Sequence, residues 1–299
     1  MNTTTIISGV SGEIGQAFKV YFENKGHTVY GFSSRFTEGL EQLDFLDNEA
    51  VKRFFENHKN QISEAEVINF LHLIGPFKTE MDLLTGEQVI ENPREDNNLD
   101  DGIYRSTVET FENGVEGIRD IKKDNQKLVL SVVGSISDKY NIKYFQSSRE
   151  SKNLIRRNIE KLTKEQKNIF GRIINVSSIY SKKEFQERPF TSEKDLEVWL
   201  RMEQILLVIE NENYFDSSGD FYREIDVFNK KEGFTPSEYY TNSNIYRTRV
   251  IQRTGKTPEE FRKMFKEFSD EQKNEQNAEV NEIKTIPYHT KFGNEMKLK

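Results

Sequence analysis

The strongest constraint on the fold of this chain is the regular alternation of short apolar runs with amphipathic stretches over its first 180 residues. Apolar runs with the length of strands lie at 4–8, 28–32, 40–45, 67–74, 128–133 and 169–176. Alternation of this kind is typical of β-α-β units around a parallel sheet. The nearly continuous run at 67–74 predicts a strand that is buried on both faces. We therefore expect an α/β fold with a doubly wound parallel sheet.

The amphipathic stretches between the runs predict the helices, at 15–24, 48–61 and 101–122, with Asn48 as the cap of the second. Ser147 and Glu150 have the spacing of a capping box, which predicts a helix from there to about residue 164. Beyond residue 180 the pattern is less regular, with a helix ending near residue 211 and an edge strand at 222–228. We expect one domain over residues 1–228, followed by a helical C-terminal extension and polar tail over residues 229–299.

The composition excludes several classes of protein. The chain has no cysteine, which excludes disulfides, thiolate metal sites and a cysteine nucleophile. Its four histidines lack metal-ligand spacing, so no metal site is expected. No apolar run approaches the roughly 18 residues of a membrane span, and no secretory signal is visible. A net charge of −7 opposes nucleic-acid binding. We expect a cytoplasmic protein that acts on a small molecule.

A glycine-rich segment directly follows the first predicted strand. Residues 8–15 read Ser-Gly-Val-Ser-Gly-Glu-Ile-Gly and open a predicted helix. Glycines there permit a tight turn and let the backbone approach a pyrophosphate, while the helix N-terminus supplies N–H donors. In this position the segment predicts a dinucleotide-binding turn, and an ordinary glycine-rich turn is the alternative. The expected contacts are Gly9, Ser11, Gly12, Ile14 and Gly15.

This segment resembles the cofactor turn of the short-chain dehydrogenases/reductases, whose usual form is Thr-Gly-x-x-x-Gly-x-Gly. Gly9 and Gly15 match the outer glycines, while Glu13 stands at the middle one. Further matches follow in order over roughly residues 3–180. The resemblance implies a Rossmann-type sheet, a nicotinamide dinucleotide cofactor and oxidoreductase activity.

The resemblance also implies cofactor contacts on later strands. Asp44 and Phe45 resemble the Asp-hydrophobe pair that contacts adenine in that family. His72 and Gly75 begin and end the segment that stands where the family has Asn-Asn-Ala-Gly after strand four, and only the glycine is retained. Lys152 matches the lysine that binds the cofactor ribose.

The end of the second predicted strand bears on the choice between NAD(H) and NADP(H). NAD enzymes often place an acid there to bind the ribose hydroxyls. Here the positions hold Ser33, Ser34 and Arg35, and the next acid is Glu38. Because a guanidinium offers two parallel donors to a phosphate, this set favours the 2′-phosphate of NADP(H) over NAD(H). The alternative is that Arg35 is a solvated loop residue.

The catalytic set departs from the family pattern. Ser135 ends the fifth strand, as the family's catalytic serine does, and Ser151-Lys152 matches the end of its Tyr-x-x-Ser-Lys motif. The tyrosine position is occupied by Ser148, whose hydroxyl is far less acidic than a phenol. Tyr144 is the candidate replacement as proton donor, with Tyr140 as a second nearby phenol. The family's asparagine position falls near Thr107 or Val108, so the asparagine is also lost.

Three interpretations stay open: a reductase with an altered proton donor, a non-catalytic or regulatory dinucleotide-binding relative, and an interaction protein with a C-terminal aromatic helix. Relatives with this fold commonly pair through the helices after strands four and five. We therefore expect a homodimer or homotetramer that uses the Phe111/Val115/Ile118 face and the helix of Leu154. The basic residues of that second helix are interpreted as a solvated or subunit-facing surface, with attraction of an anionic substrate as the alternative; they are Arg149, Lys152, Arg156, Arg157 and Lys161.

Overall fold

The computed structural model describes residues 2–76, 80, 89–140, 145–179, 199–211, 221–228 and 260. Apart from residue 260, the predicted C-terminal extension and tail at 229–299 lie outside the described residues. Within them, the chain forms a seven-stranded sheet in the order β3-β2-β1-β4-β5-β6-β7, and every pairing is parallel. The strands are β1 (Thr3–Ser8), β2 (Thr28–Ser33), β3 (Glu41–Gln42), β4 (Val67–His72), β5 (Lys127–Ser135), β6 (Ile169–Val176) and β7 (Tyr222–Val227).

The strand order confirms the predicted Rossmann-type sheet. From β1 the chain first moves outward to β2 and β3, then returns to the other side of β1 to place β4 and the later strands. The direction of winding therefore reverses between β1 and β4. In open parallel sheets, ligands bind beyond the carboxyl ends of the strands at such a reversal.

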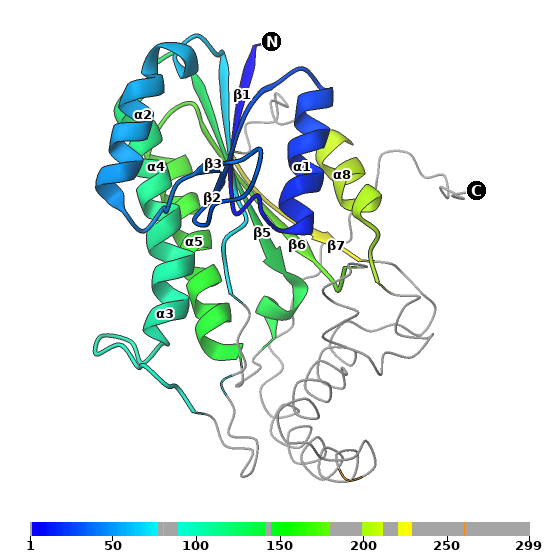
Figure 1. Cartoon of the computed structure of the whole chain (residues 1–299). Helices are drawn as coiled ribbons and strands as arrows, with labels where there is room; N and C mark the ends of the chain where they lie inside the picture. Colours follow the sequence, from blue (N-terminus) through cyan, green and yellow to red (C-terminus); the bar gives the residue numbers. More distant parts are fainter. Residues whose placement is uncertain are drawn as a thin grey trace, which may run out of the picture.

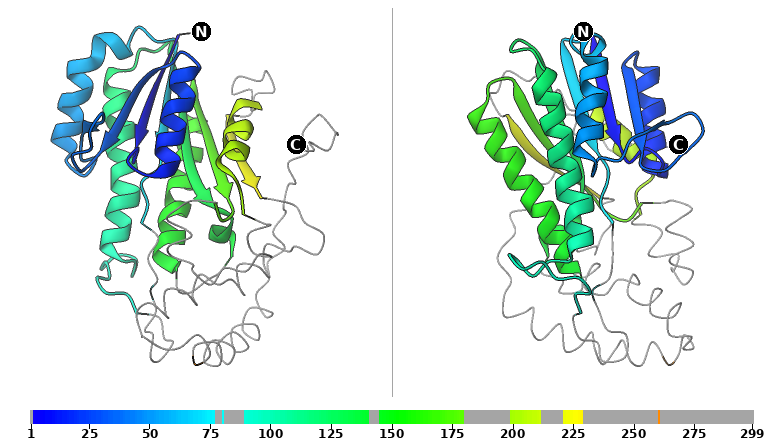
Figure 2. Two further views of the ribbon diagram at one scale, coloured as in Figure 1. Left: turned by 45° about the vertical axis from the view of Figure 1, so that its right-hand side comes forward. Right: turned by 60° about the vertical axis from the view of Figure 1, so that its left-hand side comes forward.

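Helices cover both faces of the sheet (Figure 1). One face carries α2 (Asn48–Ile62), α4 (Thr110–Ile121) and α5 (Gln146–Glu165), and the other carries α1 (Glu13–Asn24) and α8 (Met202–Asn211). The two rotated views in Figure 2 show the same two layers. The short helix α3 (Asp101–Tyr104) leads into α4 through a π-helical turn, Arg105–Glu109. Among the described residues, no helix is long and apolar enough to cross a bilayer.

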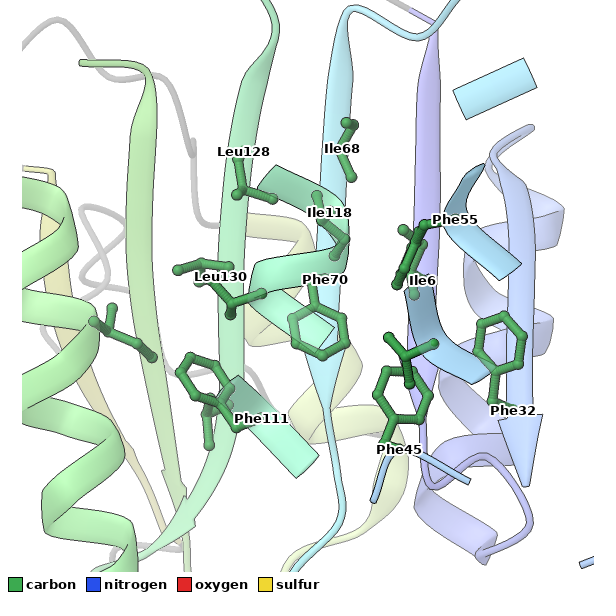
Figure 3. Close-up of a cluster of buried hydrophobic side chains, with 14 of the residues drawn as sticks. Ile6, Phe32, Phe45, Phe55, Ile68, Phe70, Phe111, Ile118, Leu128 and Leu130 are labelled. Carbon is green, nitrogen blue, oxygen red and sulfur yellow. The ribbon is translucent and has the colours of Figure 1, made fainter. Parts of the chain in front are cut away.

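Aromatic rings fill the layer between the sheet and α2, α4 and α5 (Figure 3). Phe70 of β4 lies 6.1 Å from both Phe45 and Phe111, measured between ring centroids. The chain has 22 phenylalanines and only four alanines, so large rings supply much of this core. Glycines make room for them, because a Cβ on Gly114 of α4 would lie 2.5 Å from the Phe70 ring. A Cβ on Gly117, one turn later, would overlap the ring of Phe55.

Three local predictions need correction. The third strand is only Glu41–Gln42, shorter than the predicted 40–45. The cap of α2 is Asp47, whose carboxylate accepts from the Ala50 amide, and not Asn48. Ser147 and Glu150 do not form a capping box, because α5 begins at Gln146 without a side-chain cap.

The surface predicted for subunit pairing also needs correction. Phe111, Val115 and Ile118 are at most 5 % exposed and pack into the core of their own chain. They face the sheet, so they are not available to a second subunit. The outward positions of α4 carry Glu112, Glu116 and other charged residues instead.

Candidate functional site

The glycine turn lies between β1 and α1, at the carboxyl edge of the sheet. Gly9 has φ +79°, a conformation that glycine adopts without the strain a Cβ would cause. A Cβ on Gly15 would lie 2.6 Å from Val10 Cα, so only glycine lets the first turn of α1 pack this closely on the preceding loop. The predicted roles of these two glycines in forming a tight turn therefore match the geometry.

The start of α1 is open toward the edge of the sheet. Gly12 is the N-cap residue and provides no side-chain cap, and a Cβ placed on it would meet nothing closer than Gly9 O at 3.9 Å. Ser11 is exposed beside it, while Ile14 packs toward the core and contributes through its backbone position only. Backbone N–H groups at a helix N-terminus, with free space in front of them, are the usual cradle for a phosphate. This part of the site fits a dinucleotide.

The loop after β2 lies next to this turn, because the Val10 amide donates to the Phe32 carbonyl at 3.0 Å. Ser33 is buried, and its hydroxyl accepts from the Arg35 amide at 3.2 Å. Ser34 and Arg35 are exposed. Of the three predicted contacts, Ser33 therefore shapes the loop, while the other two present a hydroxyl and a guanidinium to a ligand.

Asp44 and Phe45 have different environments. Asp44 is exposed, and its carboxylate accepts from the Leu46 amide at 2.9 Å. Phe45 is 1 % exposed and packs in the aromatic core, and its carbonyl accepts from Asn113 of α4 at 2.7 Å. The Phe45 ring thus anchors the loop, and Asp44 is the member of the pair that is accessible to a ligand.

His72 ends β4 in a fully buried position. Its Nε2 lies 3.1 Å from the Thr107 carbonyl, which only accepts, so the proton is assigned to Nε2. Its Nδ1 then accepts from the Ser8 hydroxyl at 2.9 Å. Burial, and to a smaller extent the positive charge of Lys152, lowers the pKa of His72 to about 3. The ring is therefore neutral, and it ties β1 and β4 to the π-helical turn.

Thr107 lies in this π-helical turn, where the sequence predicts the loss of the family's asparagine. The residue is buried, and its carbonyl is the acceptor for His72. Thr110, which begins α4, donates from its hydroxyl to the Ser106 carbonyl at 2.7 Å. π-Helical turns are frequent at functional sites. Here the turn directs a backbone carbonyl toward the end of β4.

Lys152 connects α5 with two strand ends. Its Nζ donates to the Val133 carbonyl of β5 at 3.2 Å. A Cβ on Gly75, just after β4, would lie 2.9 Å from the same nitrogen. The pKa of Lys152 is lowered to about 8, because burial and Arg156 lower it by more than Asp138 raises it. The ammonium group is thus mostly charged at pH 7 and lies between the ends of β4 and β5.

Ser148 lies one turn before Lys152 on α5. It is buried, and its hydroxyl donates to the Pro76 carbonyl at 3.3 Å. Tyr144, the predicted proton donor, lies outside the described residues. Burial raises the pKa of Tyr140, and the charge of Asp226 raises it further, so this second phenol is a weaker acid than an exposed tyrosine.

Ser135 ends β5 and caps a 3₁₀ turn, Ile136–Lys139. Its hydroxyl lies 2.7 Å from that of Ser137 and accepts from the Ser137 amide, while the Asp138 carboxylate accepts from the Ser135 amide at 2.9 Å. The pair of hydroxyls is an arrangement that can hold a carbonyl oxygen. Sequence reasoning missed Ser137 and Asp138, although the Ser-x-x-Asp spacing of a capping box was present.

A second contact that sequence reasoning missed joins the first turn of α5 to the segment after β4. The buried carboxylate of Glu80 accepts from both the amide and the hydroxyl of Ser147. The Ser147 hydroxyl also accepts from the Asp100 amide at 2.7 Å. No local signal in the sequence marks this contact, because Ser147 lies 67 residues from Glu80 and 47 residues from Asp100. Over the described part of the chain, no group of histidines and acids has metal-binding geometry.

Solved structures with the same architecture include several whose titles name short-chain dehydrogenases/reductases. A short-chain type dehydrogenase/reductase from Mycobacterium ulcerans aligns with a TM-score of 0.60 and 11 % identity, over 76 % of this chain and 88 % of that one. The ligand-free aldohexose dehydrogenase of Thermoplasma acidophilum gives 0.58 and 10 %, over 76 % and 92 %. An alcohol dehydrogenase from Thermococcus sibiricus, complexed with 5-hydroxy-NADP, gives 0.56 and 12 %, over 76 % and 97 %.

Sequence comparison adds nothing to these likenesses. No protein-family model matches the chain, and no curated protein matches it. The chain therefore has the fold of the short-chain dehydrogenases/reductases, at identities where the fold alone is shared.

Proposed function

We propose that this protein is an NADP(H)-dependent oxidoreductase that interconverts a carbonyl and an alcohol on a small molecule. The observation that carries the proposal is the placement of the Lys152 ammonium against Gly75 and Val133, at the ends of β4 and β5, where the segment after β4 also meets Gly9 of the glycine turn. Two of the structural neighbours have titles that name a bound NADP or NADP derivative, which supports a cofactor of this class.

Each part of the site has a role in this proposal. The amides at the start of α1 bind the pyrophosphate, Asp44 binds the adenine, and Lys152 binds the nicotinamide ribose. The nicotinamide, when bound, supplies or accepts the hydride. Ser135, with its neighbour Ser137, holds the substrate oxygen, on which negative charge develops during reduction. Ser148, one turn before Lys152 on α5, helps to orient the substrate or a water molecule.

The preference for NADP(H) rests on Ser34 and Arg35, because both are exposed beside the glycine turn and no acid ends β2. Calorimetry should show tighter binding of NADPH than of NADH, and Arg35→Ala should reduce this difference in affinity. Arg53→Ala, which removes an exposed cation on α2, is the matched control and should leave the difference in affinity unchanged. Tighter binding of NADH, or unchanged preference in Arg35→Ala, would refute the assignment.

The proton donor is the least conventional part of the proposal. A positive charge within about 4–6 Å favours the ionised form of a phenol, so Lys152 is suited to activate a tyrosine. We assign that role to Tyr144, four residues before Ser148. In an assay of NADPH oxidation over a panel of carbonyl compounds, Tyr144→Phe should reduce turnover more than Ser148→Ala does. Equal activity of Tyr144→Phe and wild type would remove this tyrosine from the mechanism.

A non-catalytic dinucleotide-binding protein is the second candidate. The serine at position 148 and the threonine at position 107 favour it, since both replace residues that the family uses in proton transfer. The two candidates make different predictions in one experiment. Tight NADPH binding without oxidation of NADPH by any carbonyl in the panel would favour the regulatory function.

The assembly and compartment complete the proposal. We propose a homodimer or homotetramer in the cytoplasm, with contacts through the charged outer positions of α4 and α5 in place of the buried Phe111 face. Light scattering at micromolar concentration should give a mass of two or four chains. A monomer would contradict it.

A further inference from the structure

A network of buried charged and polar side chains lies at the carboxyl ends of β5, β6 and β7. Arg156 of α5 is its centre, because one guanidinium nitrogen donates to Asn175 at 2.6 Å and to Asp138 at 3.1 Å. Asn175 donates in turn to Asp226 at 2.9 Å, and Lys139 pairs with Asp226 at 2.6 Å. The Asp138, Arg156 and Asp226 side chains are 6, 11 and 5 % exposed, so their charges are largely removed from water.

The network touches the candidate site along three consecutive residues of β5. Val133 accepts from Lys152, and the Ser135 amide donates to Asp138. Between them, a Cβ on Gly134 would lie 2.8 Å from Arg156, so a side chain there would displace the guanidinium. Three consecutive residues at the end of β5 therefore contact the Lys152 ammonium and the buried ion pair of Arg156 and Asp138, and the last of the three carries the Ser135 hydroxyl.

Stability alone gives little reason for such a network. Moving ions out of water costs several kcal/mol each, and replacing a buried ion pair with apolar groups of the same volume is often neutral or stabilising. Arg156 lies one helical turn after Lys152, where two like charges on one inner face repel each other. Asp138 lies against the second of these cations and offsets part of that repulsion.

We propose that Asp138 and Arg156 are positioning residues of the candidate site, which hold the end of β5 at Ser135 and set the charge environment of Lys152 in opposite directions. The inference rests on the proposed function, because it concerns the lysine that binds the cofactor. It assigns a role to a helix cation that the sequence places in a solvated cluster. The two residues act through Ser135 and Lys152.

Several charged or titratable groups face Lys152. The carboxylate of Asp138 comes from the 3₁₀ turn and raises the pKa of Lys152, and the guanidinium of Arg156 comes from α5 and lowers it. From β4, His72 faces Lys152 as a neutral ring. Behind Arg156 lie the acids of β7: Glu224 pairs with the guanidinium at 3.8 Å, and both Glu224 and Asp226 accept from Asn175.

The test is the affinity for NADPH measured by fluorescence from pH 6 to 9.5. The affinity should fall as Lys152 loses its proton. The midpoint is the pH at which half of this fall in affinity has occurred, and it reports the charge state of the lysine. Arg156→Met should move the midpoint up and Asp138→Asn should move it down, each by about one pH unit. Arg157→Met removes the adjacent, exposed cation and should leave the midpoint unchanged. Arg156→Lys should restore the wild-type midpoint.

Opposite shifts separate this role from a structural one, because loss of packing would weaken binding at every pH in both variants alike. Shifts in the same direction, or none, would overturn the inference. If the wild type does not bind NADPH, the proposed function fails, and the inference is then tested without cofactor. Peptide mass spectrometry then follows the rate at which acetic anhydride labels Lys152 as a function of pH. The midpoint of this pH profile should shift in opposite directions in the two variants. Equal profiles in the variants and in wild type would refute the inference.

Discussion

Protonation of His72 should destabilise the protein in mild acid. The ring donates from Nε2 to the Thr107 carbonyl and accepts at Nδ1 from the Ser8 hydroxyl. A second proton would bind to Nδ1, which could then no longer accept this hydrogen bond. The pKa of His72 is about 3 in the folded chain, against 6.5 for an unperturbed histidine. Since the unfolded chain binds the proton more readily, stability is complete above pH 6.5 and falls as the pH drops toward 3.

The size of the loss follows from the two pKa values. At pH 5 the histidine is almost fully protonated in the unfolded chain and neutral in the folded one. At about 1.4 kcal/mol per pKa unit, this difference lowers the free energy of unfolding by about 2 kcal/mol. A loss of this size is a large fraction of the stability of an ordinary domain, which is about 5–15 kcal/mol.

Urea unfolding at pH 7.5 and pH 5.0 measures this loss. The chain has a single tryptophan, Trp199, which is 2 % exposed, so its fluorescence reports unfolding. Wild type should lose about 2 kcal/mol more between the two pH values than His72→Gln, whose amide keeps a donor and an acceptor without titrating. Equal losses would refute the reasoning. If the variant does not fold, the His72 ring resonances of the wild type should stay unshifted over this range, and titration of the ring would refute the assignment equally.

Three further substitutions test the packing around the site. Gly75→Ala should weaken NADPH binding about tenfold, or about 1.4 kcal/mol, because the new Cβ displaces the end of the Lys152 side chain. The melting temperature should change little, and calorimetry and thermal unfolding together check both results. Gly117→Ala should destabilise the chain by about 1–3 kcal/mol in urea unfolding, since its Cβ overlaps the Phe55 ring, and a gain in stability would contradict it. Ser147→Ala removes a hydroxyl that donates to the buried Glu80 carboxylate and should cost about 1–3 kcal/mol, whereas a cost near zero would show that this contact is dispensable.

The order of strands and helices was predictable because each element carries its own periodic pattern. The buried run at 67–74 and the glycine turn after β1 are local features, and both appear where they were expected. The length of β3 was not predictable, since only Glu41 and Gln42 of the predicted strand are in register with residues of β2.

The candidate site was predictable only in part, because several of its contacts join distant segments. His72 has partners 64 and 35 residues away, and no local pattern indicates which groups it meets. Arg156 was interpreted as part of a solvated surface on the strength of its charge. Its spacing of four residues from Lys152 was the better guide, since that spacing places both on one face of α5. Arg157 and Lys161 lie on the neighbouring face of α5, and they are the members of the basic cluster that are exposed.

The two glycines of α4 bear on how the chain reaches this structure. Each glycine in the middle of a helix costs about 1 kcal/mol relative to alanine, so residues 110–121 have little tendency to form a helix alone. The helix is stable where Phe55 and Phe70 fill the space that Gly114 and Gly117 leave open. Helix formation and docking are therefore one cooperative step. A peptide of residues 101–121 should show a coil spectrum by circular dichroism, and the aromatic layer should protect the α4 amides from hydrogen exchange only once β4 is in place.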